Sequence, residues 1–218
     1  MTYSEENYLK VIYHLSLASS KSVVTTNAIA NVMESKPSSV TDMVQKLAEK
    51  DLVSYKKYQG VSLTEKGRLH AVMIVRKHRL WEVFLVEKLD FSWDEVHDVA
   101  EQLEHIKSEK LIDKLDAFLD FPTEDPHGDP IPDRNGMIAK VEKQLLSETE
   151  LNKKVICVGV KDSSSAFLQY LDKQQIALGS AIRVVSKEDF DQSLTLLVDD
   201  KQVSVSNKIA ANLFVKPV

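Results

Sequence analysis

Residues Pro37-Ser-Ser-Val-Thr-Asp-Met-Val-Gln-Lys-Leu47 decide how the first third of this 218-residue chain folds. The apolar positions of this stretch are Val40, Val44 and Leu47, which recur at i, i+4 and i+7 and so share one helical face. Proline suits the first turn of a helix, because its missing N–H would have no partner there. We therefore predict a helix from Ser38 to Lys50.

Neighbouring segments extend this helix into a motif. Residues 26–34 carry apolar residues at helical spacing and predict a shorter helix, and two helices joined by a tight turn form a helix-turn-helix. Residues 52–63 alternate around the turn Gln59-Gly60, which predicts a β-hairpin, the wing of a winged helix. Residues 4–19 predict a further helix in front of the motif.

The middle of the chain has helical patterns and its end has β-type patterns. Three further helices are expected at residues 64–89, 93–109 and 110–119. Residues 121–136 contain four of the six prolines, which predicts a rigid connector without helix. A small β-barrel or sandwich with one helix at 163–173 is expected from apolar runs at residues 155–160, 182–185, 194–198 and 202–205.

Charge is distributed unevenly along the chain, although the net value is only −5. Residues 1–70 carry nine Lys/Arg against seven Asp/Glu, a net +2. Residues 71–135 carry eight against sixteen, a net −8, and residues 136–218 carry eleven against ten, a net +1. An acidic middle suits the concentration of cations, and the first segment does not repel polyanions.

Composition favours a reduced, cytoplasmic setting. No apolar run approaches the ~20 residues of a membrane span, and the N-terminus lacks the pattern of a signal peptide. The single cysteine, Cys157, cannot form an internal disulfide, and it lies in an apolar run that predicts a buried position.

A set of metal-ligand residue types lies on the predicted fourth and fifth helices. His78 and Glu82 fall at i and i+4 of the fourth helix. On the fifth, two imidazoles and two carboxylates fall at i, i+4, i+7 and i+8 and would share about 100° of one face, namely His97, Glu101, Glu104 and His105. Packed side by side, the two helices would bring all six residues around a cation.

The ligand types indicate which ion such a site would take. Imidazoles and carboxylates without a thiolate suit Mn²⁺ or Fe²⁺, although raw affinity favours Zn²⁺. Two other interpretations stay open, a solvated acidic face with incidental histidines and a zinc peptidase site. Catalysis is disfavoured, because the chain has no His-Glu-x-x-His and has Glu101 where a peptidase pattern would need histidine.

The predicted helix-turn-helix suggests contacts with DNA. Its second helix would enter the major groove with its N-terminal residues, where small side chains can approach base edges. The candidates for this role are Pro37, Ser38, Ser39, Thr41 and Asp42. Phosphate contacts are expected from Lys36, Gln45 and Lys46, and in the wing from Lys56, Lys57 and Tyr58. A winged helix used for protein contacts is the alternative.

Six motifs carry a resemblance to a known family. They are the stretch 37–47, Tyr55-Lys-Lys-Tyr-Gln-Gly60, Leu63-Thr-Glu-Lys-Gly67, Lys77-His-Arg-Leu80, Glu101-x-x-Glu104-His105 and Pro126-His-Gly-Asp-Pro-Ile-Pro132. Together they resemble the diphtheria toxin repressor family, and most closely its manganese transport regulator branch. The resemblance covers the whole chain, including a C-terminal SH3-like domain of the ferrous-iron-transport type.

The resemblance implies a fold that is mainly α with small β parts. Its expected organisation is a winged helix DNA-binding domain over residues 1–70, a helical metal-binding and dimerisation domain over 71–136, a linker over 137–153, and an SH3-like β-barrel over 154–218. Apolar faces with Leu80, Phe84, Leu111 and Leu115 would serve dimerisation.

The resemblance also implies site residues. The family's ligand positions fall on His78, Glu82, His97, Glu101, Glu104 and His105. The connector of three-domain manganese regulators has Cys-Pro-His, which is Asp125-Pro126-His127 here, and Asp162 matches a ligand given by the C-terminal domain. The first helix normally gives an Asp or a Met, where this chain has Asn7, and the next family position, an acid in the manganese branch, is Lys10.

The function implied is that of a homodimeric repressor that controls metal-uptake genes, and not of an enzyme. Mn²⁺ is the expected activating ion, with Fe²⁺ as the alternative and Zn²⁺ able to bind in vitro. Double-stranded DNA with a palindromic operator is the expected partner, without a membrane or a small organic substrate. A metal-binding enzyme or storage module that uses the winged helix for protein contacts is the competing hypothesis.

Overall fold

The computed structural model describes residues 1–18, 22–57 and 59–218. Tyr58 of the predicted wing and residues 19–21 of the predicted break lie outside the described residues. The chain forms two compact units. Unit one comprises Met1–Arg79, Glu101–Ile112 and Pro132–Ile138, and unit two comprises Leu80–Ala100, Asp113–Ile131 and Ala139–Val218.

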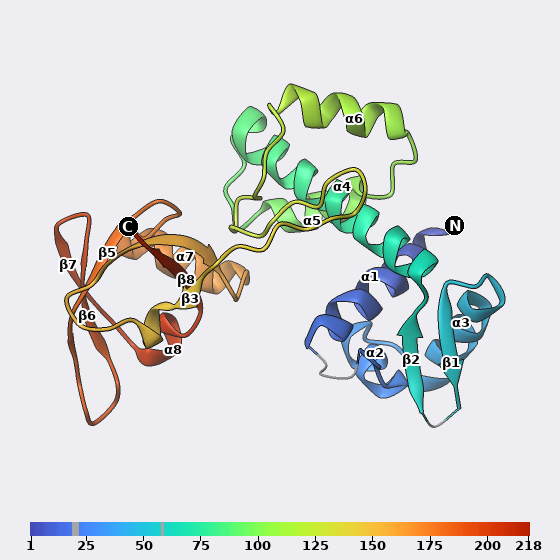
Figure 1. The fold of residues 1–218 in the computed structure, drawn as a ribbon, viewed down its shortest axis with the longest axis horizontal. Helices are drawn as coiled ribbons and strands as arrows, with labels where there is room; N and C mark the ends of the chain where they lie inside the picture. Colours follow the sequence, from blue (N-terminus) through green and yellow to red (C-terminus); the bar gives the residue numbers. More distant parts are fainter. Residues whose placement is uncertain (19–21, 58) are drawn as a thin grey trace. The chain divides into compact units, whose positions relative to one another are not determined.

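The winged helix forms as the sequence predicts, within a residue or two at each boundary. Figure 1 shows helices beside a hairpin in the blue and cyan part of the chain. Its elements are α1 (Tyr3–Ala18), α2 (Thr26–Val32), α3 (Pro37–Glu49), β1 (Val53–Lys56) and β2 (Gly60–Leu63). The hairpin is antiparallel, with Val53 opposite Leu63.

Local signals explain these boundaries. The Thr25 hydroxyl accepts a hydrogen bond from the Ala28 amide and caps α2, while Pro37 occupies the first turn of α3. The face of α3 formed by Val40, Val44 and Leu47 is fully buried, as its spacing predicts. It packs in one core with apolar residues of α1, α2, the wing and the start of the next helix.

Gly67 fixes how the fourth helix begins. A Cβ at this position would stand 1.8 Å from the Leu52 carbonyl oxygen, so only glycine lets the helix pass this close to the bend between α3 and β1. The Thr64 hydroxyl accepts from the Gly67 amide and donates to the Asp51 carbonyl, which fastens the same junction.

The helical middle contains α4 (Glu65–Leu89), α5 (Val96–Leu103) and α6 (Glu109–Phe118). The predicted fifth helix over 93–109 is too long, because the observed helix ends at Leu103. Glu104 and His105 lie in the turn that follows, so the four metal-ligand residue types do not form a single helical stripe. Side-chain contacts of Glu104 with α1 and α4, described below, override the helical spacing here.

The C-terminal part of unit two is an antiparallel sheet with the strand order β3-β8-β4-β5-β6-β7. Its elements are β3 (Gln144–Leu145), η1 (Leu146–Glu148), β4 (Lys154–Val160), α7 (Ser165–Gln174), β5 (Ala181–Lys187), β6 (Leu194–Val198), β7 (Lys201–Val205), α8 (Asn207–Ala210) and β8 (Leu213–Pro217). Four strands and α7 match the predicted segments, whereas β3, β8 and α8 were not predicted.

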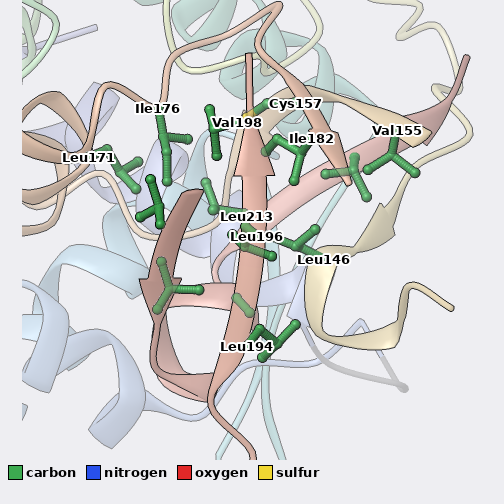
Figure 2. Packing of buried hydrophobic residues seen from close by; sticks show 14 of the residues in the cluster. Leu146, Val155, Cys157, Leu171, Ile176, Ile182, Leu194, Leu196, Val198 and Leu213 are labelled. Atoms are coloured by element: carbon green, nitrogen blue, oxygen red, sulfur yellow. The ribbon is translucent and has the colours of Figure 1, made fainter. Parts of the chain in front are cut away.

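The segment 137–153 is not a linker throughout, which corrects the prediction for its second half. Gln144 and Leu145 pair with β8, and Leu146 is fully buried in the core of the sheet. Figure 2 shows Leu146 among the apolar side chains of that core, which include Leu194, Leu196 and Leu213. The short strand escaped prediction because two paired residues leave no periodic pattern.

In the part of the chain that the structure describes, no helix is both long enough and apolar enough to cross a membrane.

Cys157 provides a test of this core. Its side chain is buried, and burial raises the pKa of the thiol to about 11. Since a thiolate forms only as the pH rises toward that value, native Cys157 should react with a disulfide reagent at pH 8 about a hundredfold more slowly than an exposed cysteine. Denaturant should restore the normal rate. Rapid reaction of the native protein at pH 8 would contradict the buried position.

Candidate metal centre

Unit one gathers polar side chains from three elements into what we call the amino-terminal cluster. The first helix α1 supplies Glu6, Asn7 and Lys10, and α4 supplies His78. The end of α5 and the following turn supply the remaining members, Glu101, Glu104 and His105.

Glu104 lies at the centre of this cluster and is completely buried. One of its oxygens, Oε2, lies 2.7 Å from His78 Nδ1. The Lys10 ammonium lies 2.7 Å from each of the two carboxylate oxygens. A buried carboxylate is stable only with such partners, so Glu104 joins α1, α4 and the turn after α5.

The same contacts keep Glu104 ionised. Burial alone raises the pKa of this carboxyl, but the hydrogen bond from His78 and the charge of Lys10 outweigh burial and hold the pKa below its usual value. Glu104 therefore presents a negative oxygen to its surroundings at neutral pH.

His105 is held in one orientation by its neighbours. Its Nδ1 lies 2.6 Å from Glu6 Oε2, and its ring packs against the Tyr3 ring with the centroids 3.9 Å apart. An Nδ1–H that donates to Glu6 leaves the lone pair on Nε2, which lies 3.6 Å from Glu104 Oε1. A carboxylate behind a histidine in this way is the usual support of a metal-ligating imidazole.

The described residues of unit one include two buried acceptor atoms without a hydrogen-bond partner, Asn7 Oδ1 and His105 Nε2. Glu104 Oε1 accepts no well-directed hydrogen bond, but its charge is balanced by the Lys10 ammonium at 2.7 Å. Leaving such an atom unsatisfied costs about 1–3 kcal/mol. Two ligand atoms of one ion are about 3.0–3.6 Å apart at bond lengths near 2.1 Å, which the 3.6 Å separation of the histidine and glutamate atoms matches. This nitrogen and this oxygen are therefore spaced as two ligands of one divalent cation would be.

Glu101 and His78 also belong to the cluster, and they lie beside each other near the Lys10 ammonium. The Lys10 ammonium lies 2.5 Å from Glu101 Oε1, and a ligand atom of His78 lies within 4.8 Å of one of Glu101. The roles of Lys10 and Glu6 were not predicted. Lys10 follows Asn7 by one helical turn, but spacing alone does not show that its ammonium reaches residues 91 and 94 positions away.

Unit two contains a second group, which we call the connector cluster. Buried ligand atoms of Glu82, Asp125 and His127 lie within 4.8 Å of one another. His127 Nδ1 lies 3.8 Å from Glu82 Oε1 and 3.9 Å from Asp125 Oδ1. His97 approaches the same group, with its Nδ1 3.7 Å from Glu82 Oε1, but its side chain is half-exposed.

The tautomer of His127 follows from its other contact. Nε2 lies 2.8 Å from the Trp93 carbonyl oxygen, which can only accept, so Nε2 carries a proton, and in the neutral imidazole the lone pair is on Nδ1. The Trp93 ring is stacked on the imidazole, with an angle of 9° between their planes. The lone pair is thereby directed toward Glu82 and Asp125.

The sheet of unit two supports the connector cluster from behind. The Val160 amide of β4 donates to the His127 carbonyl oxygen. Gly128 has a φ of +79°, and a Cβ there would stand 2.0 Å from the Val158 carbonyl oxygen, so glycine is required for the close approach. Asp125 Oδ1 accepts from the amides of His127 and Asp129, which forms the turn that holds both ligand side chains.

Asp162, also predicted as a ligand, is engaged in a local turn. Its Oδ1 accepts from the Ser164 amide at the start of α7, and this bond lowers the pKa of the carboxyl. Asp162 is not a member of the connector cluster. Among the described residues, the ligand atoms grouped there belong to Glu82, Asp125 and His127.

The predicted DNA-contacting residues are mainly at the surface of the winged helix. All of them except the partly buried Thr41 and the undescribed Tyr58 are exposed, namely Lys36, Pro37, Ser38, Ser39, Asp42, Gln45, Lys46, Lys56 and Lys57. The Thr41 hydroxyl donates to the Pro37 carbonyl oxygen, which directs its proton into the helix.

Comparison with known protein families accounts for most of the chain. The pattern of the iron-dependent repressor N-terminal DNA-binding domain matches residues 1–61. That of the iron-dependent repressor metal-binding and dimerisation domain matches residues 64–133, and the FeoA domain matches residues 144–217.

Relatives and solved structures agree with these matches. The transcriptional regulator MntR of Oceanobacillus iheyensis is 36% identical over 124 residues, which cover 57% of this chain and 82% of that protein. A solved manganese-dependent transcriptional repressor in complex with manganese has a TM-score of 0.85 at 34% identity, over 98% of this chain and 100% of that one. The chain belongs to the iron-dependent repressor family, also called the diphtheria toxin repressor family.

Its relatives place the chain in the manganese transport regulator branch, as the sequence motifs predict. Family members are metal-dependent, DNA-binding transcriptional repressors and not enzymes, which supports the predicted function over the alternative of a metalloenzyme or storage module. The DNA-binding domain indicates DNA as a partner, and the dimerisation domain indicates a second copy of the chain.

One further match is confined to part of a larger protein. A probable metal transport system membrane protein of Chlamydia trachomatis is 47% identical over 88 residues, which are 40% of this chain and 19% of that protein. The chain thus spans about a fifth of that relative, and the match concerns only the shared segment.

The support of the connector cluster by β4 generates a prediction. Gly128→Ala should weaken Mn²⁺ binding at this cluster by about tenfold or more, because the connector must move away from β4 and carry His127 with it. Calorimetric titration measures this binding. The step that disappears in His127→Ala is assigned to the connector cluster.

Gly179→Ala is the matched control for Gly128→Ala. Gly179 has a similar φ of +86°, but a Cβ there would meet nothing within 4 Å. Its substitution therefore adds backbone strain without a clash and should leave Mn²⁺ affinity unchanged. Equal affinities in the two variants would contradict the proposed support.

The contact of Glu6 with His105 generates a second prediction. Glu6→Gln should weaken Mn²⁺ binding at the amino-terminal cluster by about 10–100-fold, because a neutral amide orients the imidazole less firmly. Glu5→Gln is the control, since Glu5 is also buried on α1 but pairs with Lys50. It should lower stability without lowering Mn²⁺ affinity. A similar affinity loss in both variants would remove Glu6 from its supporting role.

Proposed function

We propose that this chain represses metal-uptake genes and binds its operator tightly only when a divalent ion, Mn²⁺ in the first place, is present. The observation that carries this proposal is a pair of buried acceptor atoms, His105 Nε2, which has no hydrogen-bond partner, and Glu104 Oε1, which lies 3.6 Å from it. They lie in the unit that also contains the winged helix. Metal-dependent repression in its relatives supports the proposal.

We assign the ion-binding roles to two groups of residues. In the amino-terminal cluster, Asn7, Glu104 and His105 would hold the ion, with His78 and Glu101 beside them. In the connector cluster, Glu82, Asp125 and His127 would hold a second ion, and His97 could reach it. An ion in either cluster would supply positive charge to buried carboxylates and imidazole lone pairs.

The chemistry of the ligands favours Mn²⁺ or Fe²⁺ over a thiolate-bound metal. Both clusters offer nitrogen and oxygen atoms, and the buried Cys157 belongs to neither. Asn7 provides a neutral amide oxygen where the manganese branch has a carboxylate, which reduces the charge of the amino-terminal cluster. We place Mn²⁺ first because the solved structure described above contains manganese.

DNA recognition is assigned to α3 and the wing. The exposed N-terminal turn of α3, with Ser38 and Ser39, would face base edges in the major groove, and Lys56 and Lys57 would contact phosphates. In a homodimer, two such helices would read the half-sites of a palindromic operator one helical turn apart, or a multiple of it. A cytoplasmic location fits the DNA partner and the single reduced cysteine.

The winged helix and the amino-terminal cluster share α1, which couples the two. Leu9 and Ile12 of α1 are fully buried in the core that also contains the buried face of α3. Lys10 on the same helix reaches Glu101 and Glu104 of the cluster. Binding at the cluster would therefore fix α1 and, with it, the reading helix. A coupling of ~2–3 kcal/mol would strengthen DNA binding by roughly 30–150-fold.

DNA-binding titrations test this function. Mn²⁺ should strengthen binding of the wild-type protein to operator DNA by roughly 30–150-fold. His105→Ala should remove most of this gain, because Nε2 is one of the three proposed ligand atoms. Fluorescence anisotropy with a labelled operator fragment measures the affinity with Mn²⁺ and with a chelator.

His70→Ala is the control for His105→Ala, since His70 is an exposed histidine of α4 outside both clusters. It should retain the full effect of Mn²⁺. If wild-type protein binds operator DNA equally well with and without Mn²⁺, the proposed function is wrong. If His105→Ala keeps the whole effect, His105 is not a ligand of the controlling ion.

A further inference from the structure

Lys10 occupies an unusual place in the amino-terminal cluster. Its ammonium lies 2.5 Å from Glu101 Oε1 and 2.7 Å from both oxygens of Glu104. The Lys10 residue is only 8% exposed and Glu104 is fully buried. Long lysine side chains are almost never buried to this extent unless they are paired, so this ammonium is a structural part of the cluster.

The surroundings of the ammonium resemble those of a bound ion. Glu101 and Glu104 supply oxygens, and His78 donates to Glu104 while one of its ligand atoms lies within 4.8 Å of Glu101. One nitrogen and two carboxylates would bind a divalent ion at about 2.0–2.2 Å. The N–O distances of 2.5–2.7 Å are only about half an ångström longer, so an ion and the Lys10 ammonium cannot both occupy this position.

The part of the cluster near His105 is arranged differently. His105 Nε2 is a buried acceptor without a hydrogen-bond partner and lies 3.6 Å from Glu104 Oε1. Glu104 therefore borders two positions for positive charge, one taken by Lys10 beside Glu101 and one beside His105 Nε2.

We propose that Lys10 is a tethered cation that takes the place of a metal ion between Glu101 and Glu104, so that the amino-terminal cluster accepts one divalent ion and not two. This inference rests on the proposed function in one respect, namely that the position beside His105 holds the controlling ion. It concerns the number of bound ions and not DNA binding. Its consequence is that, within this cluster, only the position near His105 responds to the ion.

Counting bound Mn²⁺ in Lys10 variants tests the proposal. Lys10→Met keeps a long side chain without the charge, and it should bind one more Mn²⁺ per subunit than the wild type. The additional ion should be lost again in the double variant Lys10→Met/His78→Ala. Equilibrium dialysis with metal analysis gives the number of ions, and calorimetric titration gives their affinities.

Two further variants serve as controls. Lys10→Arg keeps the positive charge and should bind the same number of ions as the wild type. Lys50→Met removes another lysine that pairs with α1, through Glu5 at 2.6 Å, and should also leave the number unchanged. An unchanged number in Lys10→Met, or a gain in either control, would overturn the proposal.

Thermal stability and electron paramagnetic resonance keep the test decisive if Lys10→Met is unstable. Without metal, the variant should melt below the wild type, because two carboxylates lose their cation. Mn²⁺ at about 100 times its Kd should raise its Tm by about 5–10 °C more than that of the wild type.

In the wild type, electron paramagnetic resonance spectra of bound Mn²⁺ should show no exchange-coupled pair, since such a pair needs two ions sharing a carboxylate. A coupled pair in the wild type would overturn the proposal without any variant.

The ion count and the DNA titration fail independently of each other. A wild-type protein without metal-dependent DNA binding would refute the proposed function, while the gain of an ion in Lys10→Met would still stand. An unchanged ion number in Lys10→Met, with metal-dependent DNA binding intact, would refute only the role of Lys10.

Discussion

The buried carboxylate of Glu104 is the constraint on which the rest of unit one depends. A charge without exposure to water must be compensated by its neighbours, and here these are Lys10 of α1 and His78 of α4. The turn after α5, the start of α1 and the middle of α4 are therefore held together by one side chain. Because α1 also packs in the core of the winged helix, this electrostatic centre is joined to α3, the helix proposed to read DNA.

The sequence predicts the local elements well where periodicity is strong. The apolar spacing of Val40, Val44 and Leu47, and Pro37 in front of it, locate α3 to within a residue, and the family resemblance is confirmed by the comparisons. The end of α5 is predicted wrongly, because helical spacing continues through His105 while the buried contacts of Glu104 require a turn. The short strand β3 leaves no pattern of its own and exists only through its pairing with β8.

In the candidate site, the sequence predicts which residue types could bind a metal but not which long-range contacts they make. Histidines and carboxylates at helical spacing point to the ligand types, and they supply members of both clusters. Two residues of the amino-terminal cluster, Glu6 and Lys10, are invisible to this argument because each acts through a contact more than 90 positions away. The connector cluster likewise depends on Gly128, whose role appears only once β4 lies against it. Long-range packing, and not the spacing of ligands, brings the members of each cluster together.

Anomalous scattering at the manganese edge, from crystals grown with Mn²⁺, would locate the ion relative to Glu104. We expect a peak within bonding distance of His105 Nε2 and Glu104 Oε1, with the Lys10 ammonium still between Glu101 and Glu104. A peak between Glu101 and Glu104 with Lys10 displaced toward solvent would contradict this expectation, as would the absence of any peak beside His105.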